Sequence, residues 1–375
     1  MAKAASPKIS GSGVLPIQAL KALAEAGAIK AEASFAPDQF QPASFDLRLG
    51  PVAFRVRASF LPGEGATVMD RVQALGMHKM DLSEGAVLER GCVYIVPLME
   101  RLKLDRDIEG LANPKSSIGR LDVFTRVIAD RSTAFDRVPA GYKGPLYAEI
   151  APRTFSIVAR QGSRLCQLRL KRGAAAFDAG AIMDLHRKTP LVHYESGANA
   201  VLREDAIGVA IDLSGDTATR LVGYRAKRHT DAVDLDKKGA CDPADFWDPI
   251  QPTRDRSLIL DPNEFYILAT REAVSVPPDY AAEMIAYDTM VGEFRVHYAG
   301  FFDPGFGWDP AGGKGSRAVL EVRSHEVPYV LEHGQIVGWL RFEKLAARPD
   351  TVYGQGIGSH YQGQGLQLSK HFRKP

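Results

Sequence analysis

The stretch CVYIVPL, residues 92–98, shows the pattern that decides the fold class. It is a short run of β-branched and aromatic residues, which is typical of a buried strand. Runs of the same kind, separated by Gly, Pro and Asp, fill most of the chain: SFDLRLG, AFRVRASF, FSIVAR and RLCQLRL in the first half, and GVAIDLSG, RAVLEVRS and YVLEHGQIVGWLRF in the second. One short helix is indicated near the N-terminus by LPIQALKALAEAGAI. The sequence therefore predicts a mainly β protein of barrels or sandwiches.

The strand-like runs also repeat along the chain. Three pairs of residues are each separated by 172 positions: Tyr94 and Tyr266, Glu149 and Glu321, Gly162 and Gly334. A constant offset over three separate segments indicates an internal duplication. We therefore expect two tandem domains, residues 1–190 and residues 191–375, with the connection in FDAGAIMDLHRKTPLVHYESGANA.

Composition excludes several classes of protein. Apolar residues make up 45% of the 375 residues and the formal net charge is +2, so a broad nucleic-acid-binding surface is not indicated. No apolar run has the length of a membrane span, and the N-terminus lacks the apolar stretch of a signal peptide. The three cysteines are isolated, which favours a reducing compartment. We expect a cytoplasmic protein that binds neither membrane nor nucleic acid.

The segment NPKSSIGRLDVF, residues 113–124, concentrates cations and hydroxyl groups after a proline. Pro114 makes a long helix unlikely here, so Lys115, Ser116, Ser117 and Arg120 are expected on a turn. A turn of this kind can hold phosphate, although the segment taken alone is more typical of a solvated loop.

Several motifs together resemble those of the dCTP deaminases, which share a fold with the trimeric dUTPases. They are QPASFDLRLG, PKSSIGRL, AGFFDPGFG, AVLEV and the C-terminal YGQGIGSHYQGQG. The resemblance covers most of both halves. It implies two dUTPase-like distorted β-barrels and the zinc-independent, hydrolytic deamination of dCTP to dUTP and ammonia.

The two copies differ in which motifs they keep. The first keeps KSSIGR and Gln167, whereas the second has Asp288 and Gly292 at the positions of Ser116 and Arg120, and Trp339 at that of Gln167. A carboxylate at a phosphate site repels the ligand. The second copy keeps HYAGFFDPGFG and the tail, which the first copy has altered or lacks. Each copy has retained what the other has lost, and this pattern predicts one shared site.

The resemblance assigns catalytic roles to three residues. Glu321 is predicted to carry the proton, since one buried carboxyl can serve both the attacking water and the leaving amine. Its duplicate, Glu149, is the alternative. Arg120 and Ser116 are expected to cross between the copies and reach the reacting end of the pocket.

The remaining predicted contacts divide between phosphate and base. Phosphate oxygens are assigned to Lys115, Ser117 and Gln167. The other predicted substrate-binding residues are His297, Ala299, Asp303, Phe306, Tyr353, His360 and Gln364. Asp46 is placed near the Mg²⁺-triphosphate or, equally, at a turn. The glycine-rich tail from Tyr353 is predicted to be a lid that costs little stability.

Cofactors, partners and alternative functions follow from the same reasoning. No metal is expected in catalysis, but Mg²⁺ is expected to accompany the triphosphate. The expected ligand is dCTP, with dTTP or dUTP as a possible regulator or product. Alternating copies cannot close a three-membered ring, which favours a monomer or an even-numbered assembly, with a homodimer preferred. The alternatives are a dUTP diphosphatase, a bifunctional enzyme that ends at dUMP, and a non-catalytic nucleotide-binding regulator.

Overall fold

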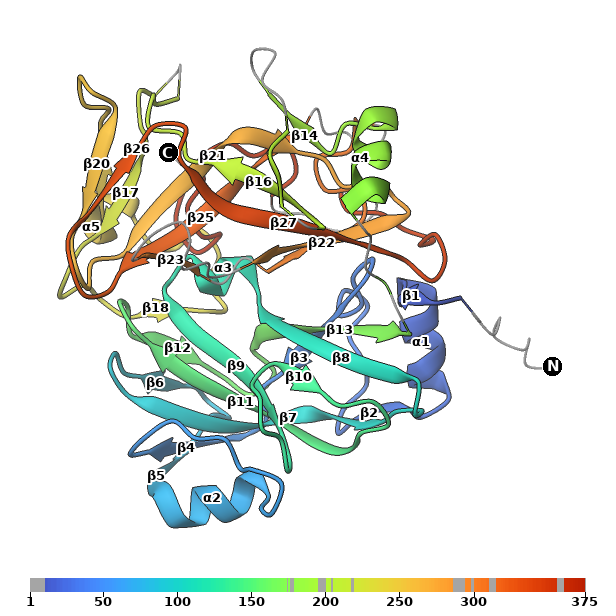
Figure 1. Cartoon of the computed structure of the whole chain (residues 1–375). Coiled ribbons are helices and arrows are strands. Elements are labelled where there is room, and N and C mark those ends of the chain that lie inside the picture. Colours follow the sequence, from blue (N-terminus) through green and yellow to red (C-terminus); the bar gives the residue numbers. More distant parts are fainter. Residues whose placement is uncertain are drawn as a thin grey trace.

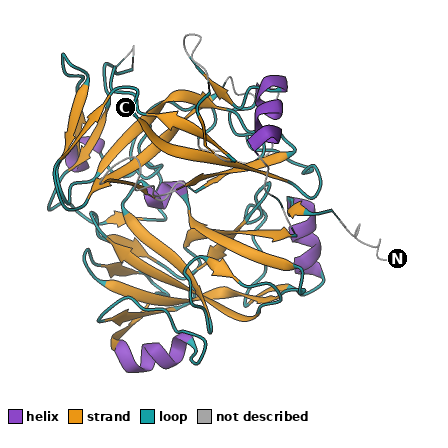
Figure 2. Ribbon diagram, in the orientation of Figure 1, coloured by secondary structure: helices purple, strands orange, loops and turns teal. Residues whose placement is uncertain are grey.

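The structure is a computed structural model. The residues that it describes are 11–173, 175, 179–194, 200–203, 205–216, 219–285, 294–297, 300–309, 315–355 and 361–374. These residues form a mainly β protein, as the sequence predicts, with most of its short helices at the periphery and one between the two halves (Figure 2). Among them, no helix is both long and apolar enough to cross a bilayer.

The first half contains two main sheets and three helices (Figure 1). One sheet has the order β1-β13-β8-β10, with β3 also paired to β13; its strands are β1 (Gly13–Val14), β3 (Phe45–Arg48), β8 (Ile108–Pro114), β10 (Arg137–Val138) and β13 (Arg164–Arg172). The other has the order β5-β4-β7-β11-β9, with β2 paired to β7; its strands are β2 (Ile29–Ala31), β4 (Val52–Val56), β5 (Gly76–Asp81), β7 (Val93–Lys103), β9 (Val123–Ala129) and β11 (Lys143–Pro152). The helices are α1 (Ile17–Glu25), α2 (Val68–Leu75) and α3 (Ser116–Gly119).

The second half repeats this plan. One sheet has the order β19-β17-β21-β25-β23, with β14 paired to β21; its strands are β14 (Val192–His193), β17 (Gly223–Ala226), β19 (Trp247–Ile250), β21 (Tyr266–Val274), β23 (Phe294–His297) and β25 (Ser316–Ser324). The other has the order β15-β16-β27-β22-β24; its strands are β15 (Leu202–Arg203), β16 (Ala206–Ala210), β22 (Tyr280–Ile285), β24 (Phe301–Phe302) and β27 (Ile336–Lys344). The helices are α4 (Ala179–Lys188) and α5 (Pro243–Phe246).

The strand register confirms the internal duplication, because equivalent residues of the two copies pair with equivalent partners. Glu149 of β11 lies opposite Ile95, and Glu321 of β25 lies opposite Ile267, so both partners are shifted by the same 172 positions. The two repeated tyrosines also make matching hydrogen bonds. The Tyr94 hydroxyl accepts from Glu89 N at 3.0 Å, and the Tyr266 hydroxyl accepts from Asp261 N at 3.0 Å. The structure thus shows the same local design in both copies.

The small third sheet differs between the halves. In the first half, β6 (Ala86–Leu88) pairs with β12 (Ile157–Ala159), and the second half adds the parallel strand β18 (Val233–Asp234) to it. The equivalent pair of the second half, β20 (Ser257–Leu260) and β26 (Tyr329–Glu332), forms a two-stranded sheet among the described residues. Figure 1 shows β18 lying beside β12, among strands of the first half.

The two halves also share apolar and charged contacts. The core of the first half includes side chains from the second, such as Trp247, Val319 and Phe372. Arg169 of β13 is buried and donates to the carbonyls of Ala282 and Phe302 at 3.3 and 3.4 Å. These contacts fix the orientation of one half on the other.

Helix α4 packs against the second half. Its Ile182 is fully buried in the second hydrophobic core, together with Leu191.

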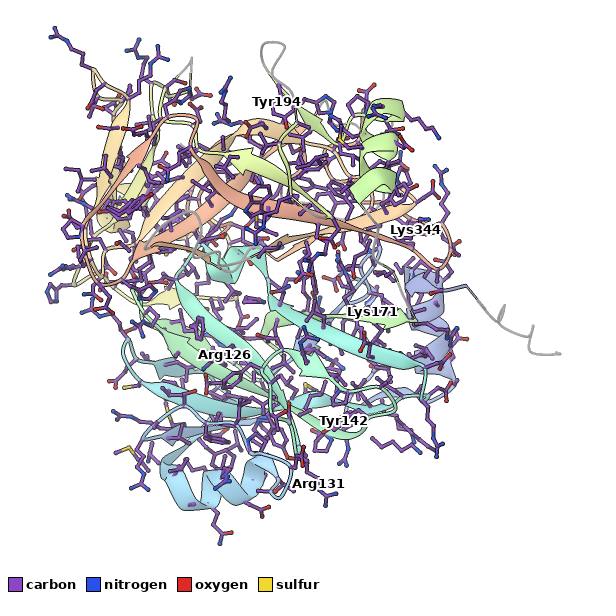
Figure 3. The ribbon with its side chains drawn as sticks, in the orientation of Figure 1. Arg126, Arg131, Tyr142, Lys171, Tyr194 and Lys344 are labelled. Carbon is purple, nitrogen blue, oxygen red and sulfur yellow. The ribbon has the colours of Figure 1, made fainter. Side chains whose placement is uncertain are left out.

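An ion pair also crosses the boundary between the halves. Lys171 of β13 has its Nζ 3.8 Å from Glu343 Oε1 of β27. Lys171 is labelled in Figure 3, as is Lys344, the last residue of β27.

The chain end is anchored by aromatic packing, which gives the first prediction. Phe372 packs against Phe155, Phe246 and Trp247 with ring centroids 5.3–6.4 Å apart. We expect Phe372→Ala to lower the free energy of unfolding by about 3–5 kcal/mol, because it empties a buried aromatic site. Urea denaturation measures this. The control is Ile259→Ala, whose side chain is 56% exposed, and it should change stability little. Equal stability of both variants would contradict the anchoring role.

Candidate active site

A pocket of about 480 Å³ lies between the two halves, a volume in the range typical of small-molecule sites. The first half contributes Lys115, Ser116, Ser117, Arg120 and Gln167. The second half contributes the turn from Phe301 to Phe306 and, from the tail, Tyr353, Tyr361, Gln364, Lys370 and His371. The structure thus brings the retained motifs of the two copies together within one chain.

Local sequence explains the shape of the cationic side. Pro114 ends strand β8, and the next residues form the single turn α3, in which Gly119 N and Arg120 N bond the carbonyls of Lys115 and Ser116. This turn directs both Lys115 and Arg120 to the pocket. Ser117 is buried, and its carbonyl accepts from the Ser369 hydroxyl at 2.7 Å. The tail therefore also holds the turn in place.

Asp46 has a structural role on the cationic side. Its Oδ2 accepts from Lys115 Nζ at 2.5 Å and lies 3.6 Å from Arg164 Nη1. Arg164 also donates to Asp38 Oδ1 at 3.0 Å. Asp46 lies within strand β3, so its predicted place at a turn is wrong. Its ion pairs hold two cations at the pocket wall, and neither alternative predicted from the sequence included them.

Lys370 adds a further cation that sequence reasoning missed. Burial is the largest cause that lowers its pKa to about 8, and repulsion from the neighbouring Lys115 and Lys238 contributes to the same shift. Because burial and the neighbouring cations destabilise the charged form of Lys370, an anionic ligand nearby would stabilise that charged form. A triphosphate would supply such a charge in this part of the pocket.

The FDPGFG turn forms the opposite wall. Gly305 and Gly307 adopt φ values of 95° and 63°, a region that other residues rarely occupy. Gly300 approaches the first half so closely that a Cβ there would lie 2.0 Å from Asn113 Nδ2. Phe306 packs against Tyr353 with ring centroids 5.7 Å apart. These constraints explain why the turn needs its glycines.

Asp303, at the centre of this turn, lies in the pocket wall with its side chain 10% exposed. Burial raises its pKa to about 6, opposed by the charges of Arg169 and Lys115. Its Oδ1 lies 3.8 Å from Arg169 Nη2. A carboxyl with this pKa changes its charge in the pH range of most enzymes and can accept a proton from water.

Arg120 connects the pocket to Glu321. Its guanidinium donates to Gln367 O at 2.8 Å and Gln364 Oε1 at 3.0 Å, and it stacks on Tyr361 at 4.0 Å from the ring centroid. Arg120 Nε lies 3.9 Å from Glu321 Oε1. The Glu321 side chain is 0% exposed and lies behind Arg120 rather than on the pocket surface.

Glu149, the duplicate of Glu321, has different surroundings. Arg126 Nε donates to its Oε1 at 3.0 Å, and the Arg126 guanidinium lies 3.5 Å from the centroid of the Phe135 ring. Glu149 does not line the pocket. Figure 3 shows Arg126 within the first half, away from the boundary between the halves. Neither glutamate lines the pocket, but Glu321 lies 3.9 Å from Arg120, which does, whereas Glu149 is paired with Arg126 inside the first half.

The tail corrects one expectation and leaves another untested. Tyr353 and Gln364 line the pocket, but Tyr361, Leu368, His371 and Phe372 are buried. A lid whose removal from Tyr353 onward costs little stability is therefore wrong, because part of the tail belongs to the core. The predicted contacts Ala299 and His360, and the sequence-based Asp288, lie outside the described residues; for His297 the structure describes only the backbone, opposite Glu321.

Sequence reasoning missed Tyr361, Lys370, Arg164 and Lys238 in the pocket. Tyr361 lies within the tail motif YGQGIGSHYQGQG. An aromatic ring in a motif assigned to the site was a signal that could have identified it as a pocket residue. The others carry no motif. Among the described residues, no group of three or more His, Cys, Asp or Glu side chains is placed to hold a metal ion.

Two family models match successive parts of the chain. The 2'-deoxycytidine 5'-triphosphate deaminase (DCD) N-terminal domain matches residues 11–174, and the C-terminal domain of the same family matches residues 178–372. Together they span nearly all of the described residues.

Individual proteins agree with these matches. The "dCTP deaminase, dUMP-forming" of Beutenbergia cavernae is 31% identical over 168 residues, which cover 42% of this chain and 82% of that protein. The protein of the same name from Pseudarthrobacter chlorophenolicus is 33% identical over 119 residues, covering 31% of this chain and 58% of the relative.

A solved structure matches over most of the chain. The crystal structure of 2'-deoxycytidine 5'-triphosphate deaminase from Agrobacterium tumefaciens is 56% identical, with a TM-score of 0.86, and the match covers 91% of this chain and 100% of that one. With both domain models matched in order, the chain belongs to the 2'-deoxycytidine 5'-triphosphate deaminase family.

Proposed function

We propose that the pocket between the halves is the site at which this chain deaminates dCTP. The observation that carries the proposal is one continuous pocket in which the cationic α3 turn of the first half faces the FDPGFG turn and tail of the second. Membership of the family supports dCTP deamination in nucleotide metabolism, and it supports an enzyme rather than a non-catalytic regulator.

The pocket offers separate environments for the two ends of dCTP. We place the triphosphate against Lys115, Ser117, Gln167 and Lys370, where the cations lie, and the cytosine toward Phe306 and the inner end. His297, Ala299, Tyr353, His360 and Gln364 remain proposed contacts to the nucleotide. Mg²⁺ would neutralise part of the phosphate charge when it enters with the substrate.

At the inner end, the reaction needs a water to attack C4 of the cytosine and a proton to leave with the amine as ammonia. Glu321 would take the proton from water and deliver it to the amine. Arg120 and Ser116 would stabilise charge that develops at the ring. The 3.9 Å separation of Arg120 Nε and Glu321 Oε1 supports this pairing of roles.

A second product is supported by a specific observation. The curated relatives are named dUMP-forming, and Asp303 has a pKa raised to about 6 by burial beside the cationic wall. A carboxyl of this kind could activate a second water for hydrolysis of the triphosphate. Chromatography of the products from dCTP decides between dUTP with ammonia and dUMP with ammonia and pyrophosphate.

We propose two dUTPase-like distorted barrels as the finer description of the fold. Because Ile182 of α4 packs in the second core, we place the boundary between β13 and α4, before the residue 190 expected from sequence. Among the described residues, the cationic turn and the FDPGFG turn meet at one shared pocket, which supports one nucleotide per chain and an even-numbered assembly or monomer, with a homodimer preferred. Calorimetric titration that found two equivalent nucleotides per chain would contradict the shared site.

The catalytic assignment predicts a contrast between the two duplicated glutamates. Glu321→Gln should reduce turnover at least about 1000-fold while binding of a non-hydrolysable dCTP analogue stays within about tenfold, because only the proton carrier is lost. Glu149→Gln is the matched control and should keep most of the turnover. Ammonia release measures both, and the reverse result would exchange the assignments.

The lowered pKa of Lys370 predicts that KM for dCTP depends on pH. Its pKa of about 8 lies below the ordinary value for lysine, so in the free enzyme the positive charge is present below pH 8 and is lost as pH rises through 8. KM for dCTP should therefore rise above pH 8. Lys370→Gln should raise KM at pH 7 and flatten this rise. A Lys370→Gln variant with the wild-type KM profile would remove Lys370 from the site.

Metal dependence gives a further prediction. Catalysis should not require zinc, whereas removal of Mg²⁺ should raise KM because the triphosphate loses its counterion. Elemental analysis and activity after chelation measure this. Stoichiometric zinc, with activity lost on chelation and restored by zinc alone, would overturn the assignment of Glu321 as the sole proton carrier.

A further inference from the structure

Two pairs of opposite charges join the end of α3 to strand β25. On the first half, Arg120 and Asp122 are separated by one residue, and on the second half Glu321 and Arg323 are separated by one residue in the reverse order of charge. Arg120 faces Glu321, and Asp122 forms an ion pair with Arg323. The two contacts therefore lie next to each other in the same interface between the halves.

The outer pair has a dense set of hydrogen bonds. Arg323 Nη2 donates to Asp122 Oδ2 and, at 2.9 Å, to Thr154 Oγ1, while its Nη1 donates to Asn263 O. Thr154 Oγ1 in turn donates to Asp122 Oδ2 at 2.6 Å. Each partner in the ion pair thus has a second hydrogen-bonding neighbour that fixes its position.

Burial makes this pair costly unless its geometry is maintained. The side chains of Arg323 and Asp122 are 6% and 1% exposed. Burial raises the pKa of Asp122, while Arg323 and the Thr154 hydroxyl act in the opposite direction. Replacing a buried ion pair by apolar side chains of similar volume often leaves a protein equally or more stable. Stability alone therefore does not explain why Asp122 and Arg323 occupy this buried position.

The pair is connected to the proposed reacting groups by short, rigid backbone. Asp122 N bonds Gly119 O, and Asp122 adopts a φ of 54° where the helical turn passes into β9. On the other side, residues 321 and 323 share one face of β25, because alternate residues of a strand point the same way. Any shift of Arg323 along the first half therefore shifts Glu321 against Arg120.

We propose that Asp122, Arg323 and Thr154 form a positioning clamp that holds Arg120 in register with Glu321 across the boundary between the halves. The proposal rests on the proposed function, since Glu321 and Arg120 act there. None of the three clamp residues lines the pocket, so we assign them a positioning role that acts through the contact of Arg120 with Glu321. Loosening the clamp should impair the chemical step and leave substrate binding intact.

The test compares three clamp variants with a buried control. Asp122→Asn removes the charge and keeps the shape, Arg323→Lys keeps the charge and loses the planar fork, and Thr154→Val removes only the bridging hydroxyl. The control is Glu272→Gln, a buried carboxylate of the second half whose Oε2 accepts from Ala210 N at 2.7 Å and which does not line the pocket.

We expect kcat for ammonia release to fall about 10- to 100-fold in Asp122→Asn, since a displacement near 1 Å costs up to about 100-fold. KM and the affinity for a non-hydrolysable dCTP analogue should stay within about threefold. Arg323→Lys and Thr154→Val should give smaller losses of kcat, and Asp122→Asn with Thr154→Val should lose less than the product of the single effects. Glu272→Gln should lower the melting temperature without lowering kcat.

The outcomes separate the clamp from the proposed function. Wild-type protein that releases no ammonia from dCTP would remove the function itself. Active wild type whose clamp variants lose thermal stability but keep kcat would overturn the clamp and leave the function. If Asp122→Asn does not fold, Thr154→Val decides, because it removes no charge; an unchanged kcat in that variant also overturns the clamp.

Discussion

The contact between α3 and β25 is the constraint on which the rest of the structure depends. Arg120 belongs to the first half and Glu321 to the second, and their atoms lie 3.9 Å apart in a region closed to solvent. A buried pair of this kind is useful only when both backbones are held still, since a small displacement leaves charges unpaired. The two halves must therefore behave as one rigid body at this boundary.

Several features of the fold meet this requirement. Strand β18 of the second half adds to the sheet formed by β6 and β12, and Trp247 and Phe372 enter the core of the first half. Arg169 crosses from β13 to the carbonyls of β22 and β24. Backbone pairing, apolar packing and a buried guanidinium thus act on the same boundary. Since Leu368 and Phe372 belong to the core of the first half, removing the chain from Tyr353 onward would also remove part of that core.

Sequence reasoning predicted the repeated plan of the fold and the two sides of the site, and it did so for a physical reason. Strand patterns and turn glycines are local, so the offset of 172 between Glu149 and Glu321 reappears as the register of β11 and β25. What it missed depends on tertiary packing. The placement of Lys370 in the pocket, the stacking of Arg120 on Tyr361 and the burial of Phe372 arise from how the tail crosses the first half, and no local pattern encodes that path.

The duplication explains how such a boundary could specialise. Two copies in one chain meet at a high effective concentration, so their association does not depend on the amount of protein. In a ring of identical chains, every copy needs both the cationic turn and the FDPGFG turn. Within this chain each motif is needed once. The first copy pairs its own glutamate, Glu149, with Arg126, which packs against Phe135, and the second copy has Trp339 at the position of Gln167. Charges such as those of Asp122 and Arg323 can then differ between the two sides of the boundary, because each side is made by only one copy.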